Sequence, residues 1–253
     1  MFNPAYRPIA LDIGYSAVKG ISPDIAFCFP RFAKKLVGSM MDSVSGEDSD
    51  ILYKDENGIY TVGELAQRQM DSASYNDSSE TMFSRNCYYS EIFKICARVG
   101  MAIGMLRSNG KAINAIQTGL PTRYIEEDAP VLRSVLAGRH TFHVKIGKRQ
   151  WRTFDFTISP DNVFIMKQPM GTFSSILRMP DGSRSEEALS LLKGRTIILD
   201  GGFGTIDLNC IYDKSVDHGE TFNNLGMRHV LESCISTINT KYGVNMEVVA
   251  IQK

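Results

Sequence analysis

The segment from Thr196 to Leu208 constrains the fold of this chain most strongly. It reads TIILDGGFGTIDL, which is an apolar run, a cluster of glycines and a second apolar run. Apolar runs of this length favour β-strands, and glycines between them favour a tight reversal, so the segment predicts a β-hairpin. Asp200 stands at the end of the first run. The predicted hairpin therefore carries a carboxylate at its bend.

The glycines at this bend suggest a site for an anion. Gly201, Gly202 and Gly204 lack side chains and tolerate positive φ, so backbone N–H groups can close around a phosphate. Asp200 would repel that phosphate unless a divalent cation lay between them, and Mg²⁺ is the expected cation. The alternative is an ordinary hairpin turn, because short glycine motifs often have no function.

The same pattern occurs a second time, near the N-terminus. Residues 9–20 read IALDIGYSAVKG, with Asp12 at the end of an apolar run, Gly14 in the turn and Lys19 on the returning strand. The Lys19 ammonium is a point charge that suits phosphate, although a solvated lysine is the alternative. Two such hairpins could hold one phosphate chain from opposite sides.

These two patterns resemble a known superfamily. Asp12-x-Gly14-x-Ser16-x-x-Lys19 is similar to the first phosphate motif, and Asp200-x-Gly202-x-Gly204-Thr205 to the second, of the actin, sugar-kinase and heat-shock-chaperone ATPases. Within that superfamily the chain most resembles the actin-like proteins of bacterial plasmid segregation, the ParM/StbA group. Three shorter stretches also fit the group: YTVGELA from Tyr60, TGLP from Thr118 and QPMG from Gln168.

The resemblance implies an α/β protein with an actin-like, ribonuclease H-like fold, in which two mixed-sheet domains flank a nucleotide cleft. We expect the first domain at 1–182, with a small variable subdomain at about 31–87. The second domain would begin at 183 and be incomplete at 253, because the adenosine-binding glycine motif of the relatives does not occur in the sequence. The sequence leaves open whether the chain is a natural protein or a fragment.

The resemblance also implies the ligands, ATP or GTP together with Mg²⁺. Asp12 and Asp200 are the implied metal ligands. The implied nucleotide-binding residues are Asp12, Gly14, Tyr15, Ser16, Lys19, Gly201, Gly202, Phe203, Gly204 and Thr205.

Gln168 is the candidate catalytic residue. It follows an expected strand at Val163–Met166 and precedes Pro169, which we expect to block the start of a helix. A glutamine amide can orient an attacking water without ionising, whereas the alternative is a surface glutamine. The resemblance places the superfamily's water-positioning residue here, as Gln in actins and commonly as Glu in ParM-like proteins. Gln168 is therefore a departure from the ParM-like pattern.

The expected function is a cytoskeletal ATPase that polymerises into filaments with nucleotide and hydrolyses it for plasmid segregation or partition. Self-association and a DNA-binding adaptor protein are the expected interactions. One alternative is an actin-fold scaffold that does not hydrolyse nucleotide. A small-molecule kinase is a weaker alternative, because it needs a catalytic Asp and none occurs in Val163–Gly171.

Composition limits the other interactions. Lys and Arg together number 28, as do Asp and Glu, so no net charge attracts DNA or an anionic membrane. No apolar run approaches the length of a membrane span and the N-terminus does not resemble a signal peptide, so we expect a cytoplasmic protein without direct nucleic-acid binding. The five cysteines include no Cys-x-x-Cys pair, which predicts buried thiols. His140 and His143 would lie on opposite faces of a strand, which argues against a metal site.

The remaining pattern alternates strands and helices, as in α/β proteins. Expected strands lie at Ile9–Ile13, Ala17–Ile21 and Ile25–Phe29, and Asn57-Gly58 predicts a hairpin. Expected helices cover Tyr88–Leu106, Arg123–Leu136, Met170–Met179 and Ser185–Lys193, and another follows Met227 and ends at Gly243.

Overall fold

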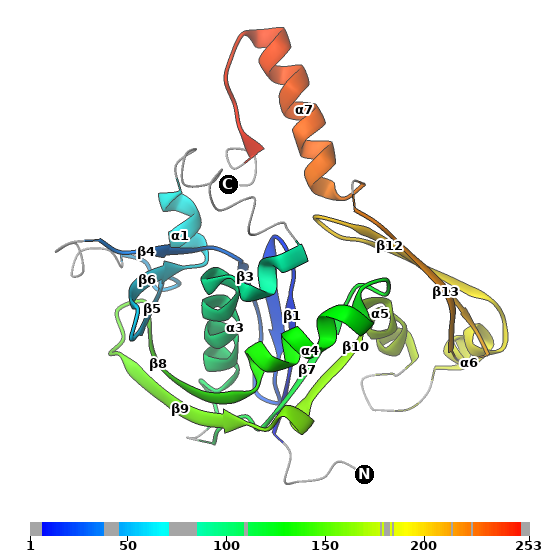
Figure 1. Cartoon of the computed structure of the whole chain (residues 1–253), viewed down its shortest axis with the longest axis horizontal. Helices are drawn as coiled ribbons and strands as arrows, with labels where there is room; N and C mark the ends of the chain where they lie inside the picture. Colours follow the sequence, from blue (N-terminus) through cyan, green and yellow to red (C-terminus); the bar gives the residue numbers. More distant parts are fainter. Residues whose placement is uncertain are drawn as a thin grey trace. The chain divides into compact units, whose positions relative to one another are not determined.

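The computed structural model describes residues 7–37, 46–70, 85–108, 111–177, 179, 183, 185–213, 215–223 and 225–248. The chain forms two compact units. The first comprises residues 1–117, 131–164 and 249–253, and the second 118–130 and 165–248. Helices and strands alternate along the sequence (Figure 1), which confirms the α/β class. The expected domain boundary at 182/183 stays a prediction.

The N-terminal strands form the predicted antiparallel meander. β1 (Pro8–Ile13) pairs with β2 (Ala17–Ile21), and β2 pairs with β3 (Ala26–Pro30). β7 (Ala115–Leu120) runs parallel to β1, and β10 (Val163–Lys167) completes a sheet of order β10-β7-β1-β2-β3.

Helix α3 (Glu91–Gly104) packs against this meander and is buried along most of its length. A 3₁₀ turn, η2 (Arg85–Tyr89), precedes it, so the helix begins later than Tyr88. The Ser90 side chain accepts the Phe93 N–H and caps the helix start. Gly104 leaves room for the Ile9 side chain, because a Cβ there would lie 2.4 Å from Ile9 Cδ1.

A second sheet in the first unit has the order β4-β6-β5-β8-β9. Its strands are β4 (Ala33–Lys35), β5 (Ile51–Asp55), β6 (Gly58–Val62), β8 (Gly138–Ile146) and β9 (Arg152–Ile158). The Asn57-Gly58 hairpin is confirmed, with Gly58 at φ 136°. His140 is buried and its Nε2 contacts the Leu136 carbonyl, whereas His143 contacts Thr153. The two histidines lie on opposite faces of β8, as predicted.

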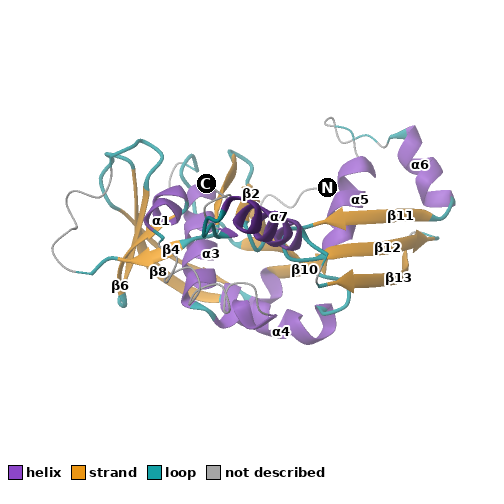
Figure 2. Ribbon diagram, turned by 90° about the horizontal axis from the view of Figure 1, so that it is seen from above, coloured by secondary structure: helices purple, strands orange, loops and turns teal. Residues whose placement is uncertain are grey.

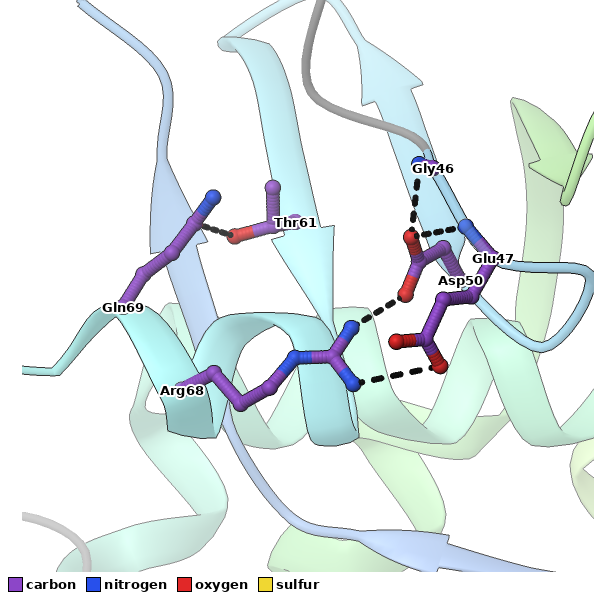
Figure 3. Close-up of polar contacts among 6 residues, drawn as sticks. All are labelled: Gly46, Glu47, Asp50, Thr61, Arg68 and Gln69. Carbon is purple, nitrogen blue, oxygen red and sulfur yellow. Dashed lines mark hydrogen bonds and ion pairs between the residues drawn. The ribbon is translucent and has the colours of Figure 1, made fainter.

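Polar contacts fix the short helix α1 (Glu64–Gln69) to its neighbours (Figure 3). Arg68 pairs with the buried Asp50 at 2.6 Å and with Glu47 at 3.5 Å. The second Asp50 oxygen accepts the Gly46 and Glu47 N–H groups. At the helix end, the Thr61 hydroxyl donates a hydrogen bond to Gln69 Oε1 at 2.8 Å. Residues 38–45 and 71–84 of the small subdomain expected at about 31–87 lie outside the described residues.

The second unit contains an antiparallel sheet of β11 (Thr196–Gly201), β12 (Ile206–Tyr212) and β13 (Ser215–Phe222), seen side by side in Figure 2. Helices α5 (Gln168–Leu177) and α6 (Glu186–Lys193) pack against it. Their shared core contains Phe173, Ile198 and Ile211. α4 (Ile125–Leu136) crosses from the second unit into the first.

On the other face of this sheet, β11 and β12 carry accessible apolar side chains, whereas β13 carries His218 and Glu220. Ile197 and Leu199 of β11 are 67% and 68% exposed. The pairing register places three partly buried β12 residues on the same face: Ile206, Leu208 and Cys210. Scattered exposed apolar residues are normal, but a contiguous group usually marks an interaction surface.

Helix α7 (Met227–Tyr242) follows β13 and ends at Gly243, as predicted, in the left-handed conformation at φ 64°. No helix in the described part of the chain is long and apolar enough to cross a membrane. All five cysteines are free, but the prediction of burial is wrong for Cys28 and Cys234, which are exposed. Both lie on outward-facing positions of amphipathic elements, where a small thiol can replace a polar side chain.

Candidate functional site

The first turn, in the first unit, joins β1 to β2. Asp12 lies opposite Lys19 on the paired strand, and the last pair before the turn is Ile13 with Val18. The Gly14 N–H donates to the Ala17 carbonyl at 3.0 Å and closes the turn. A Cβ on Gly14 would lie 3.3 Å from that carbonyl oxygen, so the close approach favours glycine.

Charged side chains flank this turn. Lys19 Nζ lies 3.7 Å from Asp12 Oδ2, and both side chains are substantially exposed. Behind the turn, the buried Arg31 donates its backbone N–H to the Ser16 carbonyl at 3.0 Å. The Arg31 guanidinium lies 5.4 Å from the centre of the Tyr15 ring, which is within cation–π range. Arg31 therefore supports the turn from inside the fold.

The second turn, in the second unit, repeats the first in its backbone register. Asp200 lies opposite Asp207, and the last pair before the turn is Gly201 with Ile206. The Gly202 N–H donates to the Thr205 carbonyl at 2.8 Å, and a Cβ on Gly202 would lie 3.0 Å from that oxygen. Each turn thus has an Asp two residues before a glycine whose N–H closes the turn onto the residue three positions later.

Asp207 is a site residue that sequence reasoning missed. It is buried and accepts hydrogen bonds from the hydroxyls of Thr205, at 3.1 Å, and Thr221, at 2.5 Å. Burial raises the pKa of Asp207, the two hydroxyls oppose the rise, and the charge of Asp200 adds to it. Alignment of the two Asp-x-Gly patterns would have revealed it, because Asp207 occupies the position that Lys19 holds in the first hairpin.

The start of α7 contacts the second turn directly. The Met227 N–H donates to the Gly202 carbonyl at 3.1 Å, and the Arg228 N–H donates to the Phe203 carbonyl at 2.9 Å. The first N–H groups of a helix have no partner within the helix, and here the carbonyls of the turn supply partners. This contact joins residues that the sequence pattern treated as separate elements.

Gln168 lies at a junction of two elements, but the expected helix block by Pro169 is wrong. β10 ends at Lys167 and α5 begins at Gln168, with Pro169 in the first turn. Proline is tolerated there because the first helical N–H groups make no intrahelical bonds. Gln168 is partly buried, and a Cβ on Gly119 would lie 2.9 Å from its Cγ. The glycine of the TGLP motif therefore leaves room for Gln168.

The donors at the second turn fit a hydrated divalent cation and a phosphate. Two carboxylates on directly opposed strand positions favour a cation, and carboxylate oxygens are suitable Mg²⁺ ligands. The described residues contain no group of three or more His, Cys, Asp and Glu side chains arranged to hold a metal. The two turns lie in different compact units.

A model of the N-terminal domain of actin-like proteins matches residues 10–171, which is more than half of the chain. This chain belongs to the actin-like protein family. The matched segment begins two residues before Asp12 and ends shortly after Gln168, so it includes the first turn and the candidate catalytic residue. The resemblance to actin-like proteins is thereby confirmed, and the second phosphate motif lies outside the matched segment.

Solved structures of actin-like proteins are also similar to this chain. A non-polymerisable quadruple mutant of pCBH ParM matches with a TM-score of 0.69 and 22% identity, over 96% of this chain and 72% of that one. Apo psk41 ParM matches with a TM-score of 0.60 and 21% identity, over 92% and 71% of the two chains. AlfA of the B. subtilis plasmid pLS32, in a filament, matches with a TM-score of 0.61 and 15% identity, over 94% of this chain and 80% of that one. Comparison with curated proteins found no match. The fold is therefore actin-like.

Proposed function

We propose that this chain is an actin-like filament protein that binds ATP or GTP with Mg²⁺, assembles with the nucleotide bound and hydrolyses it, in plasmid segregation. Membership of the actin-like family and the fold shared with ParM proteins support the proposal. The similar AlfA structure is that of a filament. A DNA-binding adaptor would connect such a filament to a plasmid.

The observation that carries the proposal is the repeated turn. Asp12 and Asp200 each stand two residues before a glycine whose N–H closes the turn, with the same strand register in both hairpins. An ordinary hairpin needs neither the carboxylate nor its repetition. The repeat is what a phosphate chain with its cation requires, since such a ligand presents two similar groups to be held.

The residues of the chain would divide the work as follows. The Gly14 and Gly202 N–H groups close the two turns, and the other backbone N–H groups of these turns would lie close to the phosphates, with Lys19 adding a positive charge. Asp12 and Asp200 would hold the waters of Mg²⁺, which neutralises the phosphate charge when bound. Gln168 would orient the attacking water through its amide. Backbone donors and positioned side chains suffice, because phosphoryl transfer depends mainly on position and charge.

Assembly and turnover test this function together. Purified protein is incubated with Mg²⁺ and ATP, GTP, ADP or no nucleotide, and followed by light scattering, pelleting and phosphate release. We expect assembly with ATP or GTP and less with ADP, followed by phosphate release. Binding and assembly without phosphate release would favour the non-hydrolysing scaffold. Absence of nucleotide binding would refute the proposal.

The role of Asp200 has a matched control. Asp200→Ala should weaken Mg²⁺-nucleotide binding strongly, measured by titration calorimetry, while the protein stays folded. Asp217→Ala changes an exposed carboxylate on β13 of the same sheet and should bind as the wild type does. If the two variants bind Mg²⁺-nucleotide with equal affinity, Asp200 is not a metal ligand.

A further inference from the structure

The backbone at the start of α7 is in direct contact with the backbone of the second turn. Gly226, directly before the helix, is buried, and a Cβ there would lie 2.4 Å from the Phe203 carbonyl oxygen and 2.6 Å from the Gly204 carbonyl carbon. Any side chain at position 226 would separate the helix start from the turn. The two hydrogen bonds donated by Met227 and Arg228 depend on this close approach.

These bonds set the direction of a donor in the turn. A trans peptide is planar, so its C=O and N–H point in opposite directions, and the described residues contain no cis peptide. The Phe203 carbonyl points to the Arg228 N–H on α7. The Gly204 N–H, in the same peptide, therefore points away from α7.

We propose that the start of α7 is a positioning element for nucleotide binding: Met227 and Arg228 hold the carbonyls of the second turn, and the Gly204 N–H is thereby directed at a phosphate oxygen. The inference rests on the proposed function, since it names which turn donor serves the phosphate and what orients it. The backbone of Gly226, Met227 and Arg228 contacts the turn and not the proposed phosphate, so these residues would act through Gly204. Occupation of the turn by phosphate would in return stabilise the start of α7.

The test removes one N–H and, because the proline Cδ takes the place of the amide hydrogen, also pushes the Gly202 carbonyl away from the start of α7. Proline lacks an N–H and is favoured at the first helical position, which is where Met227 lies. Gly226 already has the extended conformation, φ −69° and ψ 171°, that a residue before proline adopts. Met227→Pro therefore deletes the bond to Gly202 and keeps the helix. Met227→Ala shortens the side chain equally but keeps the N–H, and is the matched control.

Two measurements are made on each full-length variant. Calorimetry with ATP and Mg²⁺, repeated with GTP, should show Met227→Pro binding at least about two- to tenfold more weakly than Met227→Ala, since the loss of one hydrogen bond alone predicts that factor. Amide hydrogen exchange without nucleotide should be faster at Arg228 in Met227→Pro than in Met227→Ala. Gly226→Ala should lower affinity further, whereas Gly194→Ala, whose Cβ would meet only the Ser190 carbonyl oxygen at 3.9 Å, should not.

The outcomes separate this inference from the proposed function. If the wild type binds neither ATP nor GTP, the proposed function is wrong, and the exchange at Arg228 still decides whether α7 anchors the turn. If exchange is faster in Met227→Pro but affinity equals that of Met227→Ala, positioning by α7 is wrong while the function stands. Equal exchange in both variants would show that the anchoring itself is wrong.

Discussion

Asp207 shows how one buried side chain can make stability depend on pH. An unfolded Asp has a pKa of about 3.9, and burial raises the pKa of Asp207 in the folded protein. Between these two values the folded chain keeps a proton that the unfolded chain has lost. The free energy of unfolding should therefore fall as pH rises through this interval.

Asp207→Asn should remove this fall, because an amide does not titrate. The free energy of unfolding, measured by urea denaturation in EDTA from about pH 4 to 7, should decline less steeply for Asp207→Asn than for the wild type. Asp217→Asn, at an exposed position of β13, should follow the wild type. Identical slopes for wild type and Asp207→Asn would contradict the assignment.

Gln168 gives the second prediction for a single residue. If it orients the attacking water, Gln168→Ala should bind nucleotide normally and hydrolyse it about ten- to a thousandfold more slowly, which is roughly 1.4 to 4 kcal/mol of barrier. Filaments should then persist longer. Gln168→Glu tests the departure from the ParM-like pattern, since a carboxylate can also accept the proton of the water. The measurement is the rate of phosphate release at saturating nucleotide. Equal rates in wild type and Gln168→Ala would show that Gln168 does not orient the attacking water.

At the scale of elements, a buried polar network joins α3 to β5. Arg98 Nη1 donates to the Tyr53 hydroxyl at 2.7 Å and contacts Asp55 Oδ2 at 3.2 Å, while the hydroxyl donates to Asp55 at 2.8 Å. Burial is the main cause of the raised pKa of Tyr53, so its hydroxyl keeps the proton that it donates. Each of the three groups therefore contacts the other two.

Removal of one member should be costly, because it leaves a buried charge without its partner. Arg98→Met should lower the free energy of unfolding by about 3 to 5 kcal/mol, measured by urea denaturation. Arg139→Met breaks the exposed pair with Asp155 and should change stability little, since solvent screens exposed pairs. A similar loss of unfolding free energy in both variants would show that burial does not strengthen the contribution of the Arg98 network to stability.

At the scale of the whole molecule, the exposed apolar surface of β11 and β12 predicts association between copies. Leu199 and Ile197 lie on this face with most of their surface accessible, and burial of such surface is favourable by roughly 25 cal/mol per Å². Association through this face needs no nucleotide, unlike the proposed filament assembly.

Leu199→Asp should therefore reduce association measured by analytical ultracentrifugation over a range of concentrations without nucleotide. Val37→Asp introduces the same charge at an apolar residue of the first unit that is 84% exposed, and it should associate as the wild type does. A monomeric wild type at all concentrations, or equal behaviour of the two variants, would contradict the prediction.

Much of the architecture was predictable from local patterns. The β1–β3 meander, the Asn57-Gly58 hairpin, the β11–β12 hairpin and the end of α7 at Gly243 were all expected, because alternation, apolar runs and turn glycines act over a few residues. The two Asp-x-Gly turns were recognisable for the same reason. Each turn favours glycine where its backbone approaches itself closely, so the glycine spacing in the sequence reflects the geometry of the turn.

Only the tertiary structure revealed the contacts that support those turns. Asp207 meets Thr221 from another strand, Gly119 makes room for Gln168, and the Met227 N–H reaches Gly202. The exposure of Cys28 was likewise not predictable. Sequence periodicity determines which face of an element is apolar, but partners distant in the chain are chosen by packing, hydrogen-bond satisfaction and backbone distance, and these exist only in the folded molecule.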